Sequence, residues 1–306
     1  MDCAPPRDAT GGDGAGVPAP LFSILIPTWN NLEFLKLCVG AIRKNSRYAH
    51  QLIVHVNEGN DGTREWVRAQ GLDFTESRDN IGVCRAMNVM AARARADLLA
   101  YVNDDMYVCP DWDFFLWEEI KGVGHERFYV SSTPIEPTAA RVHLGTIAAD
   151  FGRAPADFRE RDLLENFAAL SRGDWSGATA PPCVVHRAMW EAVNGYSEEF
   201  ASGYASDPDF SLKLWARGVR HFKGLGRSRA YHFAKASTRK LPAGEGKRAR
   251  MLLLRKWGIT QEAFYTYYLR MGRDWAGLLD GGGARGWRFR LRSFYWKWRT
   301  RFLGWR

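Results

Sequence analysis

Between residues 21 and 102 the chain alternates short apolar runs with segments of helical period, and this alternation constrains its fold most strongly. The apolar runs cover residues 21–27, 51–56, 72–77 and 97–102, and the helical segments cover 31–45, 61–70 and 80–96. Strands and helices at this spacing form βαβ units and a largely parallel sheet. Because such sheets bind ligands beyond the carboxyl ends of their strands, the loops after Val56 and Val102 should share one site.

The rest of the chain has a less regular pattern. We predict strands near 127–133 and 180–186, helices near 187–194 and 207–217, and mainly helical structure after residue 240. Residues 1–20 are rich in Gly, Pro, Asp and Ala and are predicted to be a disordered leader. The expected organisation is this leader, a catalytic domain at 21–240 and a helical extension at 241–306.

Composition excludes several protein classes. No run of 18 or more apolar residues is present to form a spanning helix, and the N-terminus lacks the pattern of a secretory signal. The five cysteines are scattered without C-x-x-C spacing, which argues for reduced thiols and against a zinc site. There is no glycine-rich phosphate loop, which counts against dinucleotide dehydrogenases and P-loop NTPases. We therefore expect a cytoplasmic protein.

The apolar run at 97–102 ends in Asn103, Asp104 and Asp105. A carboxylate is costly to remove from water without a cation, so two of them at a strand end suggest a bound cation. Hard oxygen ligands favour Mg²⁺ or Mn²⁺, which commonly bind few protein carboxylates together with substrate phosphates. A solvated Asp-rich turn is the alternative, but the preceding strand places these side chains at the predicted ligand site.

Four motifs occur at the ends of the predicted strands and at the third helix. They are IPTWN after the first strand, NEGNDGT after the second, RDNIGVCRAMN at the third helix, and NDD after the fourth strand. Their order and spacing resemble the family 2 glycosyltransferases of the GT-A fold, over about residues 21–235. This resemblance implies an α/β fold with a Rossmann-like, mostly parallel mixed sheet, helices on both faces and, here, a C-terminal helical extension.

The resemblance also implies residue roles. It places the donor nucleotide against Pro27, Thr28, Asn30, Asn57, Glu58, Arg78, Asn80, Gly82, Asn103 and Asp104, and the metal ion on Asp105. The NDD sequence is similar to the family's D-x-D motif. Asn replaces the commoner Asp at 57 and 103, which puts most of the metal binding on Asp105.

A second segment, GYSEEFASGYASDPDFSLKLWARG at 195–218, resembles the family's region around the catalytic base, which falls on Asp207. A carboxylate there could take the proton of an attacking acceptor hydroxyl. Asp207 could instead only cap a helix, with Pro208 at its first position. Ser206 stands where the family has Glu. The resemblance further places His232 on the metal, although a lone His is often structural, and Lys235 and Ser237 at the diphosphate.

The last 26 residues, 281–306, contain eight basic residues and no acid, which is all but one unit of the net charge of +9. Their aromatic and leucine residues recur on one helical face: Trp287, Leu291, Phe294, Trp298, Phe302 and Trp305. This pattern is typical of a helix at a membrane surface with anionic lipids. Packing on the catalytic domain and nucleic-acid binding remain alternatives, the latter least favoured.

Together these features predict a metal-dependent inverting glycosyltransferase of the hexosyl- or deoxyhexosyl-transferase class. It would move a sugar from a nucleotide-diphospho-sugar to a hydroxyl of a saccharide or lipid-linked saccharide, in cell-surface polysaccharide or glycolipid assembly. Its place would be the cytoplasm, peripheral to the inner face of the membrane. Trp112, Trp117 and Trp175 would line the acceptor side or belong to the core. The alternative is a non-catalytic protein that binds nucleotide sugars.

Overall fold

The computed structural model describes residues 19–234 and 244–280. The strands are β1 (Phe22–Trp29), β2 (Gln51–Asn57), β3 (Asp73–Ser77), β4 (Leu98–Tyr101), β5 (Met106–Val108), β6 (Phe128–Glu136), β7 (Ile147–Ala148), β8 (Trp175–Ser176), β9 (Cys183–His186) and β10 (His221–His232). The helices are α1 (Leu32–Asn45), α2 (Thr63–Ala69), α3 (Gly82–Ala91), α4 (Trp112–Val123), α5 (Glu160–Asn166), α6 (Arg187–Ala192), α7 (Ser206–Ala216), α8 (Glu245–Trp257) and α9 (Gln261–Ala263).

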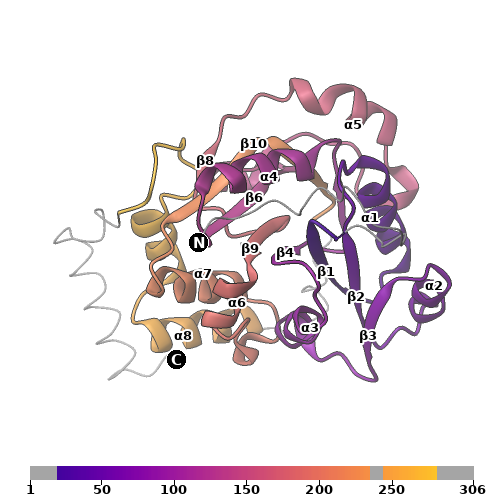
Figure 1. The fold of residues 1–306 in the computed structure, drawn as a ribbon, viewed down its shortest axis with the longest axis horizontal. Coiled ribbons are helices and arrows are strands. Elements are labelled where there is room, and N and C mark those ends of the chain that lie inside the picture. Colours follow the sequence, from indigo (N-terminus) through magenta and orange to yellow (C-terminus); the bar gives the residue numbers. More distant parts are fainter. Residues whose placement is uncertain (1–18, 235–243, 281–306) are drawn as a thin grey trace, which may run out of the picture.

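The strands form one mixed sheet in the order β3-β2-β1-β4-β9-β6-β10-β5, with β7 beside β6 and β8 beside β10 (Figure 1). β1 to β4 are parallel to one another, and β9 runs antiparallel between β4 and β6. β10 is parallel to β6. The carboxyl ends of β1, β2, β4, β6 and β10 therefore lie at the same edge of the sheet, as expected for the loops after β2 and β4.

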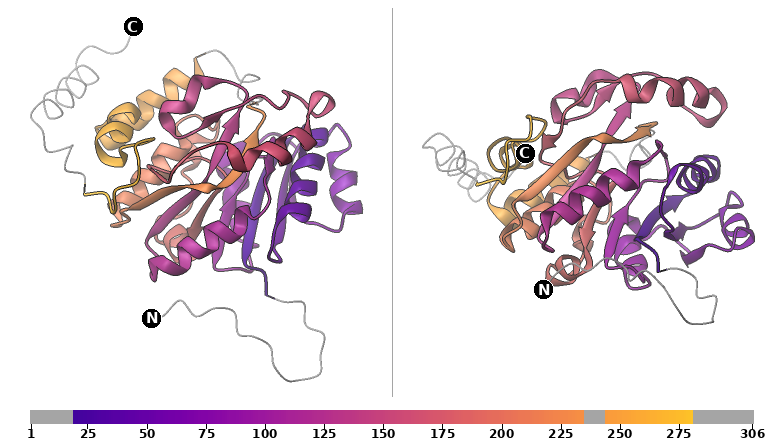
Figure 2. Two further views of the ribbon diagram at one scale, coloured as in Figure 1. Left: turned by 90° about the horizontal axis from the view of Figure 1, so that it is seen from above. Right: turned by 45° about the horizontal axis from the view of Figure 1, so that its top comes forward.

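Helices cover both faces of the sheet (Figures 1 and 2). Successive residues of β1 point to opposite faces, so Ile24 and Ile26 belong to one apolar core and Leu25 to the other. The first core takes up apolar residues of α1, α2, α4 and α5, and the second those of α3, α6, α7, α8 and α9. Two buried faces explain why the predicted strands are continuous apolar runs.

The α/β pattern predicted up to residue 102 is confirmed, with small shifts of the boundaries. β1 continues past Pro27 to Trp29, although the sequence suggested that this proline closes the strand. Beyond Leu25, β1 is paired with β2 alone, because its ladder with β4 ends there, and a proline is tolerated where one side of a strand is unpaired. α3 ends at Ala91, earlier than the helical pattern to residue 96 indicated.

The helices after residue 244 pack against the α7 face of the sheet. Leu253 of α8 and the π-helical turn η6 (Phe264–Leu269) contribute fully buried side chains to the second core. The division between a domain and an extension at residue 240 stays a prediction. In the described part of the chain, no helix combines the length and apolar character needed to span a bilayer. The amphipathic pattern at 284–306 lies outside the described residues.

Candidate functional site

Asn30 joins the loops that follow β1 and β2. Its Nδ2 donates to Oε2 of Glu58 at 2.8 Å, and its Oδ1 accepts from the backbone N–H of Asn60 at 2.8 Å. Asn30 and Glu58 both adopt left-handed backbone conformations, with φ of 47° and 61°. Each such residue stores about 1–3 kcal/mol of strain and is often found at a functional site. Two of the predicted nucleoside-binding residues are thus fixed side by side.

Thr28 lies within the same strand end and is only 2% exposed. Its Oγ1 has no hydrogen-bond partner among residues 19–234 and 244–280. Buried hydroxyls are normally hydrogen-bonded, so an orphan at this edge indicates a position that a bound molecule completes. Pro27, which precedes it, has no backbone N–H to offer.

Asn57 aligns the ends of three strands. Its Nδ2 donates to the carbonyl oxygen of Thr28 at 3.2 Å, and its Oδ1 accepts from the Ile81 N–H at 2.9 Å and from the Ser77 hydroxyl at 3.3 Å. These bonds tie the end of β2 to β1 and to the loop after β3. Its predicted contact with the nucleoside stays a prediction.

Gly82 brings the start of α3 against the loop before α7. Its φ is 77°, and a Cβ there would lie 2.1 Å from the carbonyl oxygen of Ala201, so only glycine fits. The Val83 N–H donates to that same oxygen at 3.1 Å, and Asn80 Oδ1 accepts from the Gly82 N–H at 2.9 Å. Arg78 is exposed at the start of this turn. The predicted donor-side turn therefore touches the segment that leads to Asp207.

Asp105 and His232, the two predicted metal ligands, lie next to each other. The Asn103–Asp105 turn joins β4 to β5, and β5 pairs with the end of β10 so that Met106 faces His232. His232 Nε2 is 3.4 Å from Asp105 Oδ1, and the Phe233 N–H donates to the Asp105 carbonyl oxygen at 3.1 Å. Residues 127 positions apart in the sequence are thus joined by the antiparallel β5–β10 pairing.

Glu136, the last residue of β6, holds the other side of the imidazole. Its Oε1 is 2.8 Å from His232 Nδ1, and its side chain is buried. Burial alone would lower the pKa of His232, but the carboxylates of Asp105 and Glu136 raise it to about 9. A carboxylate on one imidazole nitrogen is the arrangement that orients a histidine toward a metal through the other. Glu136 is not among the site residues predicted from the sequence, although it ends a strand in an acid as the NDD turn follows one.

Asp207, the predicted base, is the second residue of α7. The Tyr196 hydroxyl donates to its Oδ1 at 3.1 Å. Burial raises the pKa of Asp207 to about 6, while Tyr196 and the charge of Arg141 act in the opposite direction. A carboxyl with a pKa near neutrality suits a general base. The helix-cap alternative is not supported by a hydrogen bond, because α7 has no side-chain cap.

Arg141 connects the two groups of acids. It follows β6 in the short helix η1 (Ala139–Leu144), and its Nη1 is 3.7 Å from Glu136 Oε1. Its charge also acts on Asp207. In addition, burial and then the charges of Asp207 and Asp104 raise the pKa of Tyr101 at the end of β4. The Asp105–His232–Glu136 group and Asp207 therefore lie on the same side of the molecule.

The residues present fit a divalent ion that is completed by substrate oxygens. In the described ranges, no three or more His, Cys, Asp or Glu side chains are arranged to hold a metal by themselves. Asp105 and His232 nevertheless offer an oxygen and a nitrogen donor of the kinds that Mn²⁺ accepts. Ions of this class commonly take their remaining ligands from phosphates.

Other predicted residues fall elsewhere. Lys235 and Ser237 lie outside the described residues. Trp112 is fully buried with its Nε1 donating to Ser46 at 3.0 Å, and Trp175 is buried with its Nε1 donating to Thr133 at 2.8 Å. Both tryptophans are core residues, whereas Trp117 is partly buried against the first core.

The family model described as glycosyl transferase family 2 matches residues 23–160. An uncharacterized Sinorhizobium fredii protein, y4gI, is 27% identical over 220 residues, which are 66% of this chain and 23% of that protein. The chain therefore spans less than a quarter of the length of this relative.

Solved structures share the fold. The structure of S. aureus TarS 1-349 in complex with UDP-GlcNAc matches with a TM-score of 0.53 and 15% identity, over 77% of this chain and 66% of that one. TarS 1-349 in complex with UDP matches with a TM-score of 0.51 and 14% identity, over 80% of this chain and 74% of that one. Residues 23–160 therefore match glycosyl transferase family 2, and the chain has the GT-A fold.

Proposed function

We propose that this chain is a metal-dependent inverting glycosyltransferase that moves a sugar from a nucleotide-diphospho-sugar to an acceptor hydroxyl. The observation that carries the proposal is the placement of Asp105 and His232 at the same sheet edge as Asp207. A diphosphate held at the first pair would bring the sugar it carries toward a carboxylate of raised pKa. The family match over residues 23–160 and the TarS complex with UDP-GlcNAc support a nucleotide-sugar donor.

In this proposal the ends of β1 and β2 hold the nucleoside. The orphan hydroxyl of Thr28 and the Asn30–Glu58 pair supply polar groups for base and ribose. Asn103 and Asp104 lie toward the ribose and the diphosphate. The exposed guanidinium of Arg78, with Asn80 and Gly82, borders the same region.

Asp105 and His232 would hold Mg²⁺ or Mn²⁺, with Glu136 keeping Nδ1 of the imidazole occupied. The ion would neutralise charge on the departing diphosphate. Asp207 would accept the proton of the acceptor hydroxyl as that oxygen attacks the anomeric carbon. Because a single direct displacement reverses the configuration at that carbon, the product would be inverted.

We propose a saccharide or lipid-linked saccharide acceptor of the kind used in cell-surface polysaccharide or glycolipid assembly. The basic and aromatic pattern of residues 284–306 supports a peripheral position on the cytoplasmic face of the membrane. We infer that residues 21–240 form the catalytic domain and 241–306 an extension of it.

A second candidate function is the binding of nucleotide sugars without turnover. Ser206 in the place of the family's Glu favours it, and so does the commitment of the Asn57 amide to backbone and side-chain partners. Both candidates require donor binding, so turnover of the donor separates them.

Thermal unfolding of the full chain with UDP and Mn²⁺ tests donor binding. We expect UDP to stabilise the protein in the presence of Mn²⁺, and Asp105→Ala to weaken this binding by about 10–100-fold. Asp73→Ala is the matched control, since Asp73 begins β3 at the opposite edge of the sheet. Equal stabilisation of the Asp105 and Asp73 variants would remove the metal assignment.

Release of UDP from UDP-GlcNAc then tests the base, with other nucleotide sugars assayed in parallel. We expect Asp207→Asn to retain donor binding and to lower turnover by about 10²–10⁴-fold. Near-full turnover by this variant would refute the assignment of Asp207. Donor binding by the wild type without any turnover across the donor panel would favour the non-catalytic candidate.

A further inference from the structure

The Tyr196 ring is locked against the helix that carries Asp207. It stacks on Phe210 of α7 with ring centroids 4.6 Å apart and planes within 2°. Trp190 packs on it at 5.5 Å and Tyr101 meets it edge-on at 6.3 Å. Only 2% of Tyr196 is exposed. Because Phe210 and Asp207 are three residues apart on α7, the contact holds the ring close to the first turn of this helix.

The fixed ring aims its hydroxyl at one oxygen of the carboxylate. The Tyr196 hydroxyl donates to Asp207 Oδ1 at 3.1 Å, whereas Oδ2 of Asp207 takes part in no hydrogen bond with the residues that the structure describes. A hydrogen bond to the ionised form favours that form, so Tyr196 keeps the pKa of Asp207 from rising further. One oxygen is thus held while the other stays available to accept a proton.

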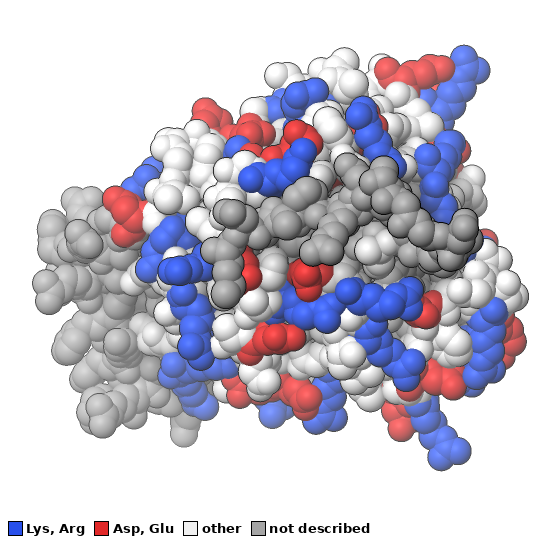
Figure 3. Space-filling view, in the orientation of Figure 1, with Lys and Arg blue, Asp and Glu red and all other residues white. Residues whose placement is uncertain are grey.

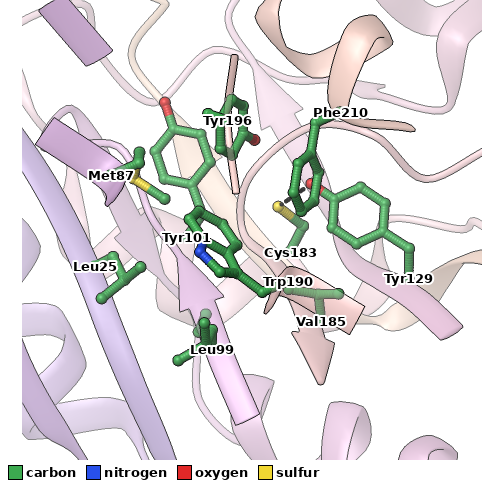
Figure 4. A pocket seen from close by; sticks show the side chains of 11 residues that line it. Leu25, Met87, Leu99, Tyr101, Tyr129, Cys183, Val185, Trp190, Tyr196 and Phe210 are labelled. Atoms are coloured by element: carbon green, nitrogen blue, oxygen red, sulfur yellow. Dashed lines mark hydrogen bonds between the residues drawn. The ribbon is translucent and has the colours of Figure 1, made fainter. Parts of the chain in front are cut away.

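A small apolar cavity lies beside Tyr196 and Phe210 (Figure 4). It is lined mainly by aliphatic and aromatic side chains, together with Tyr101, Tyr129, Cys183 and Tyr196. Tyr129 directs its hydroxyl to Cys183 Sγ at 3.0 Å, as the dashed line in Figure 4 marks. Tyr196 and Phe210 both line the cavity, so the ring that bonds Asp207 forms part of its wall.

The neighbours of Asp207 keep a constant charge while it titrates. The titratable groups that interact with it are Arg141 from η1, Tyr101 from β4, Cys84 from α3, Cys183 from β9, Tyr129 from β6, Tyr196, and Tyr265 from η6. Burial raises the pKa of each of these thiols and phenols, so they stay neutral near pH 6. Asp207 is therefore the group whose charge changes there.

We propose that Tyr196 is the positioning residue of the catalytic base: its hydroxyl holds Oδ1 of Asp207 and so orients Oδ2 for the acceptor proton. This inference rests on the proposed function, because it requires Asp207 to be the base. It assigns a role to the aromatic packing around residue 196 that the donor and metal residues do not explain.

The test is a titration of the Asp207 carboxyl in the full chain by ¹³C NMR with labelled aspartate. The resonance missing from Asp207→Asn identifies Asp207. We expect its pKa to move upward in Tyr196→Phe, because the donor to the ionised form is lost, and to stay at the wild-type value in Tyr129→Phe. Tyr129→Phe is the matched control: it also removes a buried phenol from the cavity wall, but one bonded to Cys183.

Release of UDP from UDP-GlcNAc supplies the second measurement. We expect Tyr196→Phe to lower kcat by about 10-fold with an unchanged KM for the donor, since a misplaced base slows the chemical step alone. An unchanged Asp207 pKa and kcat in this variant, with Asp207→Asn inactive, would overturn the role of Tyr196 and leave the proposed function standing. An active Asp207→Asn would instead refute the proposed base itself.

A variant that preserves the ring keeps the proposal testable if Tyr196→Phe does not fold. If Tyr196→Phe unfolds, 3-fluorotyrosine at position 196 keeps the packing and makes the phenol a stronger donor. We then expect the pKa of Asp207 to move downward from the wild-type value. The same pKa with tyrosine and with fluorotyrosine would overturn the proposal.

Discussion

At the scale of single residues, we expect the buried carboxylate of Asp207 to lower the free energy of unfolding at neutral pH. Burial raises its pKa from 3.8 to about 6, so at neutral pH the folded chain holds an ionised carboxylate in an unfavourable place. A shift of this size corresponds to about 3 kcal/mol, which partial exposure reduces. We expect Asp207→Asn to raise the free energy of unfolding by about 1–3 kcal/mol at neutral pH, measured by urea denaturation.

The pH dependence of this gain has a defined sign. Between pH 3.8 and about 6 the folded wild type binds a proton that the unfolded chain does not, so its stability rises as the pH falls through this window. The advantage of Asp207→Asn should therefore be full above pH 6 and vanish below about pH 4. Asp162→Asn, which replaces an exposed acid on α5, is the control, and its free energy of unfolding at neutral pH should stay close to the wild-type value. A variant less stable than wild type at neutral pH would contradict the prediction.

Only part of the candidate site can be predicted from the sequence, and single residues show the reason. Asp105, His232 and Asp207 lie in motifs with a recognisable order, and the structure brings the first two together. Glu136 lies outside these motifs, and Tyr196 lies within the 195–218 segment without any indication of its contact with Asp207. They meet His232 and Asp207 only because β6 ends beside β10 and because the loop before α7 folds back over Phe210. Contacts of that kind depend on tertiary packing and not on spacing along the chain.

At the scale of elements, Asp209 fastens α8 to α7. It is fully buried and accepts from Ser197 Oγ at 2.6 Å and Trp257 Nε1 at 2.7 Å, and Lys256 Nζ is 2.9 Å away. Trp257→Phe removes one of these donors and keeps a ring. We expect a loss of about 1–2 kcal/mol in the free energy of unfolding, with faster amide exchange across α8.

Trp215→Phe is the control for this effect. Trp215 is on α7, and its Nε1 makes no hydrogen bond to any residue of the ranges 19–234 and 244–280, so its replacement removes the same group without a lost bond. Exchange in α8 should then stay at the wild-type rate. Equal acceleration by both variants would mean that ring packing, and not the bond to Asp209, holds α8.

Strands and helices can be predicted from the sequence where their hydrophobic period depends only on nearby residues. The strands and helices up to β4 have one clear period each, whereas the twelve-residue strand β10 does not. Its glycines at 224 and 226 lower strand propensity, but a Cβ there would lie 1.9 Å from Trp175 and 2.0 Å from the Arg172 carbonyl oxygen. A register shift between Leu225 and Arg229 breaks the alternation as well. Both glycines and the register shift are determined by contacts with neighbouring segments, which the sequence alone does not identify.

At the scale of the whole molecule, the positive charge is concentrated at the C-terminal end of the sequence. Figure 3 shows acidic and basic side chains mixed over the described part of one face, whereas residues 281–306 carry eight basic residues and no acid. A surface of mixed charge is attracted only weakly to a membrane of anionic lipids. Eight cations interleaved with aromatic residues are attracted much more strongly. We expect the full chain to sediment with vesicles that contain phosphatidylglycerol and a chain ending at residue 283 to stay in solution.

Salt and lipid composition separate this binding from the other roles of the segment. Attraction to anionic lipid should weaken as salt screens it, and vesicles of phosphatidylcholine alone should capture less protein. If residues 284–306 instead pack on the rest of the chain, their deletion should lower the melting temperature, and the full chain should not sediment with vesicles. Salt-sensitive binding to DNA that disappears with the deletion, in the absence of vesicle binding, would assign the segment to nucleic acid. Because the proposed site lies at the sheet edge around Asp105 and Asp207, we expect UDP release to survive the deletion if the segment binds the membrane.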